Sequence, residues 1–159
     1  MLSYLLVKYV HIIGASILFG TGVGIAFFMW VAHRSGSVPV IAGVAKIVVV
    51  ADYLFTATAV VLQPVTGVML IQIVGYSVTE GWIVLSLLLY VVVGLFWLPV
   101  VKMQIRMRDL AVAAVKSGEA LPAEYYALFR KWFAFGIPAF GSVLVLFWLM
   151  IARPSISLP

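Results

Sequence analysis

Four apolar stretches, each long enough to cross a lipid bilayer as a helix, constrain the fold of this chain more than any other feature. A spanning α-helix needs about 20 apolar residues, and such stretches cover roughly residues 3–31, 52–74, 82–102 and 132–152. With 65% apolar and only 9% charged residues, the chain has too little polar side chain to cover a soluble fold of this size. Helices satisfy their own backbone hydrogen bonds in lipid. The sequence therefore predicts a single all-α domain over residues 1–159, built as an antiparallel bundle of four transmembrane helices.

The second and third of these helices are expected to extend beyond the bilayer. Residues 38–51 form a further apolar run that leads into the second span, and residues 102–117 carry five charged side chains in a stretch that continues the third. Gly118 is a plausible end for that extension. Pro122 and Glu124 favour the start of the last helix, because both suit a helix N-terminus.

Basic residues concentrate on one side of the predicted bundle. Eight Lys and Arg residues lie in the first and third loops and the adjoining helix ends, against two on the opposite side, Lys8 and Arg153. The eight are Arg34, Lys46, Lys102, Arg106, Arg108, Lys116, Arg130 and Lys131. Cytoplasmic loops are the basic ones in membrane proteins, so both termini are expected outside, in a bacterial-type inner membrane. The net charge of +5 then reflects loops near anionic lipid rather than a nucleic-acid partner.

Small residues recur every four positions along the first helix, at Ser16, Gly20 and Gly24. The glycine run 20–24 is not a nucleotide-binding loop, because it lies inside an apolar helix and follows no strand. The spacing favours close helix packing instead. It leaves open whether the partner helix belongs to the same chain or to a second copy in a homodimer.

His11 is the residue that bears most on function, because ionisable groups at membrane depth are costly and usually functional. Neutral imidazole ligates haem iron or copper, and no cysteine is present to build a thiolate site. The alternative is a hydrogen-bonded histidine between helices, with Gln63, Gln72, Tyr90 or Ser86 as its partner. His33 follows 22 residues later, about 33 Å along a helix. It therefore cannot share a metal with His11 and is expected to be solvated.

A haem held by His11 would lie in the outer half of the bilayer, beside Gln63, Met69 and Tyr90. Met69 or the His11 of a second protomer would be the sixth ligand if the iron has one. Lys8 lies three residues before His11, on the same helix face, and is placed to meet a propionate.

Asp52 is the acidic residue near the inner end of a span, and a desolvated carboxylate there needs a cation. The sequence favours an ion pair with Lys102, Arg130 or Lys131, with a proton-relay role as the alternative. Pro64, Pro99 and Pro138 lie inside three different spans. Proline disturbs a helix in a way that is compatible with a cavity, and Gln63 is the polar group expected to line it.

Two segments of the sequence resemble known membrane-protein families. Residues 8–13 read Lys-Tyr-Val-His-Ile-Ile, and residues 129–133 read Phe-Arg-Lys-Trp-Phe, followed by Pro138 and ending at Arg153-Pro154. Together they resemble HemJ-type protoporphyrinogen oxidases and CopD-like copper-resistance domains. The whole chain most resembles domain-of-unknown-function family 2269, described as predicted integral membrane proteins.

That resemblance implies a helical bundle that binds haem b, with His11 as the iron ligand and with Lys8 and Arg130 at matching positions. The third helix departs from the HemJ pattern, because Trp82-Ile83-Val84-Leu85-Ser86 contains neither the histidine nor the lysine of those proteins.

The expected function is that of a haem- or porphyrin-binding integral membrane protein of electron-transfer or oxidoreductase type. Two alternatives stay open: a non-catalytic accessory or scaffold subunit of a larger membrane complex, and a copper-handling membrane protein. No serine–histidine–acid set and no pair of carboxylates within one span is present in the sequence. The residues therefore assign no particular enzyme reaction.

Overall fold

A computed structural model describes residues 1–156 of the chain and contains only helices within them. In chain order they are α1 (Leu2–Arg34), α2 (Val38–Ala51), the π-helical turn η1 (Asp52–Thr56), α3 (Ala57–Val74), α4 (Gly81–Ser117) and α5 (Ala123–Ala152). Because α2, η1 and α3 run on without a break, the described residues form four helices long and apolar enough to cross a membrane. The predicted all-α, four-span fold is confirmed.

The helix ends follow from local sequence. Gly75 and Gly118 close α3 and α4 with φ angles of 80° and 72°, a left-handed backbone that glycine adopts without strain. Pro122 is the N-cap of α5 and Glu124 lies in its first turn. The predicted end at Gly118 and the new start near Pro122 are therefore confirmed.

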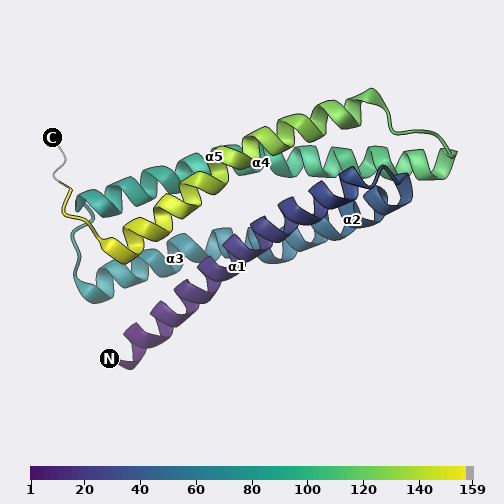
Figure 1. Cartoon of the computed structure of the whole chain (residues 1–159). Helices are drawn as coiled ribbons and strands as arrows, with labels where there is room; N and C mark the ends of the chain where they lie inside the picture. Colours follow the sequence, from purple (N-terminus) through teal and green to yellow (C-terminus); the bar gives the residue numbers. More distant parts are fainter. Residues whose placement is uncertain (157–159) are drawn as a thin grey trace.

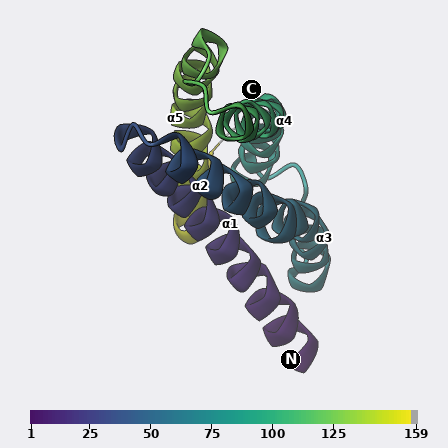
Figure 2. The ribbon, with the colours of Figure 1, turned by 90° about the vertical axis from the view of Figure 1, so that its right-hand side faces the viewer.

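The four spans run up and down, and both chain ends lie at the same end of the bundle (Figure 1). Helices α4 and α5 pack as an antiparallel pair, α2 packs on α4, and α1 packs along α2, η1 and α3. Helix α1 touches α5 only locally. Its N-terminal end projects away from the other helices, as a view along the bundle shows (Figure 2).

Tight packing concentrates at the end of the bundle where the two basic loops lie. The core there joins all four spans and includes Met29, Ile41, Met107 and Tyr125, each at most 1% exposed. The opposite end has a smaller cluster around Trp82, Ile83 and Leu149. Between these clusters the helices are less closely packed, and many large apolar side chains are exposed at membrane depth, as lipid contact requires.

Both predicted helix extensions are present, since continuous helix runs from Val38 to Val74 and from Gly81 to Ser117. The last helix also begins earlier than its span, at Ala123. Arg106 of α4 and Glu124 of α5 form a bidentate pair at 2.7 and 2.9 Å that joins the two extensions. The neighbouring Arg106 guanidinium lowers the pKa of the Glu124 carboxyl, so this pair stays ionised at neutral pH.

Candidate functional site

The π-helical turn η1 interrupts the continuous helix Val38–Val74 near its middle. One-turn π segments widen the helix and occur mostly at functional sites. Here the turn contains two polar side chains that are almost fully buried, Asp52 at 4% and Thr56 at 6% exposure. A carboxylate buried in a membrane span is costly and usually functional. Asp52 is therefore a stronger candidate for a functional residue than His11.

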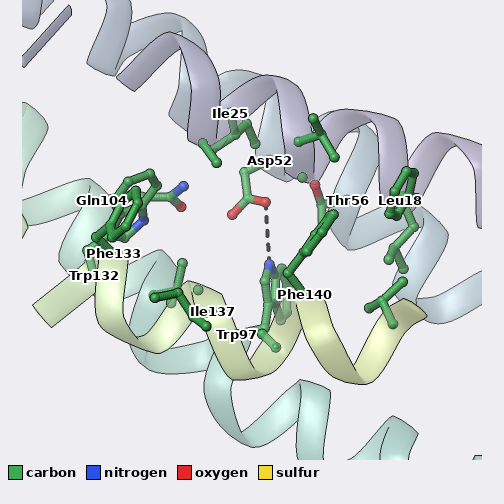
Figure 3. A pocket seen from close by; sticks show the side chains of 18 of the residues that line it. Leu18, Ile25, Asp52, Thr56, Trp97, Gln104, Trp132, Phe133, Ile137 and Phe140 are labelled. Carbon is green, nitrogen blue, oxygen red and sulfur yellow. Dashed lines mark hydrogen bonds between the residues drawn. The ribbon is translucent and has the colours of Figure 1, made fainter. Parts of the chain in front are cut away.

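Asp52 and Thr56 line a cavity of about 540 Å³ enclosed by α1, η1, α4 and α5 (Figure 3). Most of its wall is apolar or aromatic. The wall residues are Leu18, Phe19, Gly22, Val23, Ile25, Ala26, Phe27, Trp30, Asp52, Thr56, Val93, Trp97, Val100, Gln104, Trp132, Phe133, Gly136, Ile137, Ala139, Phe140 and Val143. The volume falls in the range of about 300–1,000 Å³ that is usual for small-molecule sites.

Asp52 has one side-chain hydrogen bond, a long one, in which Trp97 Nε1 donates to Oδ1 at 3.4 Å (Figure 3). Within residues 1–156, the ion pairs are Arg106–Glu124 and Arg108–Asp109. The predicted ion pair of Asp52 with Lys102, Arg130 or Lys131 is therefore wrong. Those three cations are exposed on the outside of the bundle, whereas Asp52 faces the cavity.

Three further polar atoms in the cavity wall are buried without a hydrogen-bond partner. They are Thr56 Oγ1, Gln104 Oε1 and Trp132 Nε1. Buried polar groups are nearly always paired in native proteins, and an unpaired one costs about 1–3 kcal/mol. Each atom belongs to a residue of the cavity wall, but it is buried, so its side chain would have to turn to reach a molecule inside the cavity.

Trp97, Gln104 and Trp132 are functional candidates that the sequence reasoning missed. A signal for two of them was present, because Val93, Trp97, Val100 and Gln104 are spaced by four, three and four residues. Such spacing places side chains on one helix face. A polar amide on an otherwise apolar face marks that face as one that points into the bundle, and here it lines the same cavity as Asp52.

His11 lies outside the cavity wall, between α1 and α3. Its Nδ1 lies 2.7 Å from Thr66 Oγ1, and that hydroxyl donates its hydrogen to the Leu62 carbonyl oxygen at 2.7 Å. When the Thr66 hydroxyl donates to that carbonyl, it accepts from His11 Nδ1–H, and this tautomer leaves the lone pair of the imidazole on Nε2. The interhelical hydrogen bond predicted as the alternative role of His11 is present, but its partner Thr66 is not among the residues predicted.

Gln63 is next to His11 as predicted, but it packs against α1 instead of lining the cavity. Its Nε2 donates to the His11 carbonyl oxygen at 3.0 Å. The two helices approach closely because Gly14 has no side chain: a Cβ atom at Gly14 would lie 2.5 Å from Gln63 Nε2. The expectation that Gln63 lines a cavity is therefore wrong for the cavity found here.

The other predicted haem neighbours have contacts or exposure of their own. Met69 is 41% exposed, and the Tyr90 hydroxyl donates to the Val60 carbonyl oxygen. Lys8 lies over the ring of Tyr4, 5.5 Å from its centroid. Arg130 is exposed near the start of α5, in the part of the bundle that holds the basic loops.

The small-residue face of α1 packs against no other helix among residues 1–156. Ser16 and Gly20 are exposed. A Cβ at Gly20 would meet no atom within 4 Å, and one at Gly24 would meet only Phe28 of the same helix. Of the two partners left open by the sequence, a helix of the same chain is therefore wrong, and a second copy is untested.

His33 is not the solvated loop residue that was expected. It lies in the last turn of α1, where its ring stacks on Phe129 at a centroid separation of 3.7 Å. Its Nδ1 is buried without a hydrogen-bond partner. The helix continues to Arg34, three residues past the predicted span, and this carries His33 into the packed end of the bundle.

Comparison with known proteins gives one match. The model of the family described as "Predicted integral membrane protein (DUF2269)" matches residues 5–154, nearly the whole chain. No curated protein matches, and no solved structure does. The match includes all four spans and the whole cavity wall, and the chain belongs to this family of predicted integral membrane proteins.

Proposed function

We propose that this protein binds a small lipid-soluble molecule in the cavity between α1, η1, α4 and α5. The observation that carries the proposal is the combination of a 540 Å³, largely apolar cavity with Asp52 buried in its wall. An apolar cavity with a few convergent polar groups is the usual form of a ligand site. Apolar walls would hold the body of the molecule, and the polar atoms would orient one end of it.

The rim of the cavity supports entry from the lipid. Phe27 and Trp30 of α1 and Phe133 and Ile137 of α5 line it, and each of these side chains is between 42% and 63% exposed. The two helices touch only locally, so the cavity reaches the surface between them, at a depth where the surrounding solvent is hydrocarbon. A ligand would then come from the membrane rather than from water.

Tryptophan fluorescence tests the proposal, because Trp30, Trp97 and Trp132 line the cavity. Brominated dodecanol, an apolar quencher with one hydroxyl, is titrated into the protein in lipid nanodiscs. Saturable quenching is expected for the wild type. Quenching that rises only linearly, as for a quencher dissolved in lipid, would overturn the proposal.

A pair of glycines on α5 supplies the matched variants. Gly136 lines the cavity and Gly141 does not, and a Cβ at either would meet no atom within 4 Å. Gly136→Leu should fill the cavity and abolish saturation, whereas Gly141→Leu should leave it unchanged. Equal effects of the two variants would place the quencher elsewhere.

Haem binding at His11 is a second candidate function, and one observation favours it. Histidine ligands usually donate their second ring N–H to a fixed acceptor, and Thr66 Oγ1, 2.7 Å from His11 Nδ1, can serve as that acceptor. The residues fit one axial ligand, without the ring of haem neighbours that was expected. Protein purified from haem-replete cells should show a Soret band that His11→Ala removes. A wild type without this band would exclude the haem candidate.

The two other expected roles have less support. A copper site would need several ligands, and residues 1–156 hold no group of three His, Cys, Asp or Glu side chains that could share a metal ion. A role as an accessory subunit, or a homodimer, would use the uncovered face of Ser16, Gly20 and Gly24. Gly20→Leu should then break the assembly, and an unchanged assembly in detergent would remove that face from consideration.

The proposed placement is a bacterial-type inner membrane with both termini outside. Support comes from the basic residues, since the loops that follow α1 and α4 lie together at the end opposite both termini (Figure 1). Basic loops stay on the cytoplasmic side.

A further inference from the structure

Asp52 is the only titratable side chain in the wall of the cavity. Neither Lys, Arg, His, Glu nor Tyr contributes to the wall from α1, η1, α4 or α5. The carboxyl group is 4% exposed and has no ion pair in the part of the chain described here. A buried carboxyl group is either neutral or paired with a cation, and residues 1–156 place no cation in the wall of this cavity.

The surrounding side chains suit a positive charge. Trp97 and Trp132 line the cavity together with Phe133 and Phe140, and their positions around Asp52 are visible in Figure 3. The faces of such rings attract cations, tryptophan most strongly, and more so where water is excluded. An aromatic wall around one acid is therefore complementary to an organic cation and repels an anion.

Hydrogen bonding narrows the class of cation. Gln104 Oε1 is buried, unpaired and part of the same wall as the Asp52 carboxylate. Both are acceptors, and an ammonium group that still carries N–H bonds would satisfy them once the Gln104 amide turns toward the cavity, whereas a quaternary ammonium would not. The unpaired donor Trp132 Nε1 fits an oxygen of the same molecule.

We infer that the molecule held in the cavity is a lipophilic ammonium ion whose N–H groups donate to Asp52 and Gln104 while its hydrocarbon part contacts the aromatic wall. This inference rests on the proposed function, because it names the ligand class of the same cavity. The charge of the ligand replaces the missing cation, so binding would remove the cost of leaving Asp52 unpaired.

Two quenchers with the same brominated hydrocarbon tail but different head groups test the ammonium inference separately from the proposal that the cavity binds a lipid-soluble molecule. Brominated dodecylamine, which is protonated at neutral pH, and brominated dodecanol, which is neutral, are titrated separately into wild-type protein in zwitterionic nanodiscs. A hydrogen bond to a charged group contributes enough free energy for about tenfold or stronger affinity. We expect the amine to saturate at about one tenth of the alcohol concentration or less.

Asp52→Asn should abolish the preference for the amine while leaving alcohol quenching saturable. Asp109→Asn is the matched control, because Asp109 is an exposed acid paired with Arg108 outside the cavity. That variant should keep the wild-type preference.

Other outcomes contradict either the ammonium inference alone or the proposed function as well. If amine and alcohol saturate equally in wild type, or if Asp52→Asn keeps the preference, the cavity binds lipophiles and the ammonium inference is overturned. If neither quencher saturates in any variant, the proposed function fails together with the inference.

Discussion

Replacing Asp52 by Asn should stabilise the protein in the absence of ligand. The substitution removes a charge that is 4% exposed and unpaired in the described chain. It keeps the carbonyl oxygen that accepts from Trp97 Nε1. An ionised aspartate at the centre of a span costs about 2.5–3.5 kcal/mol. Asp52 lies nearer the inner end of its span, so this cost is an upper bound, and the gain should lie between zero and about 3 kcal/mol. For a chain of this length, each kcal/mol shifts Tm by about 2–4 °C, which corresponds to a rise of up to about 10 °C.

Thermal unfolding in detergent, followed by the loss of near-ultraviolet circular dichroism, measures this shift. The direction of the Tm shift decides whether Asp52 is paired, because breaking a buried ion pair by removing one partner destabilises by about 3–5 kcal/mol. Asp109→Asn, at an exposed site, should leave Tm nearly unchanged. A fall of Tm in Asp52→Asn alone would refute the conclusion that Asp52 is unpaired.

Two further predictions concern packing and orientation. Gly14→Ala should destabilise by about 0.5–1.5 kcal/mol, because the new Cβ would displace Gln63 Nε2 from its hydrogen bond to the His11 carbonyl oxygen. Gly20→Ala, where a Cβ meets nothing, should not lower Tm, and equal melting of the two variants would contradict the α1–α3 contact. A reporter active only in the cytoplasm should give signal when fused after Ser117 and none after Ser77, and the reverse pattern would overturn the orientation inferred from loop charge.

The spans could be predicted because their signal is local. Twenty apolar residues in a row identify a membrane helix wherever its neighbours lie, and Gly118 ends α4 through its own backbone preference. Even the extensions beyond the bilayer could be inferred from charge and continuity. These features needed no knowledge of which helix packs against which.

The candidate site could not be predicted in the same way, because it depends on which faces of distant helices meet. Asp52 was recognised as unusual, but the assumption that depth alone brings it to Lys102, Arg130 or Lys131 ignored the direction in which each side chain points. Those cations face outward, while Asp52 faces Trp97. The same holds for His11, because its hydrogen-bond partner Thr66 depends on how α3 packs against α1.

The π-helical turn was also beyond prediction from the sequence. Nothing in the residues Asp52–Thr56 distinguishes a widened turn from an ordinary α-helical one, since the turn forms where tertiary packing favours it. Its effect is to place Asp52 and Thr56 in the wall of one cavity.

Locating a bound brominated ligand tests the central claim most directly. Crystals grown with brominated dodecanol and measured at the bromine absorption edge reveal bromine by anomalous scattering. The account predicts an anomalous peak inside the cavity, between Trp97 of α4 and the α5 residues Trp132 and Phe140. Bromine found only on the outer, lipid-facing surfaces of the helices would contradict it.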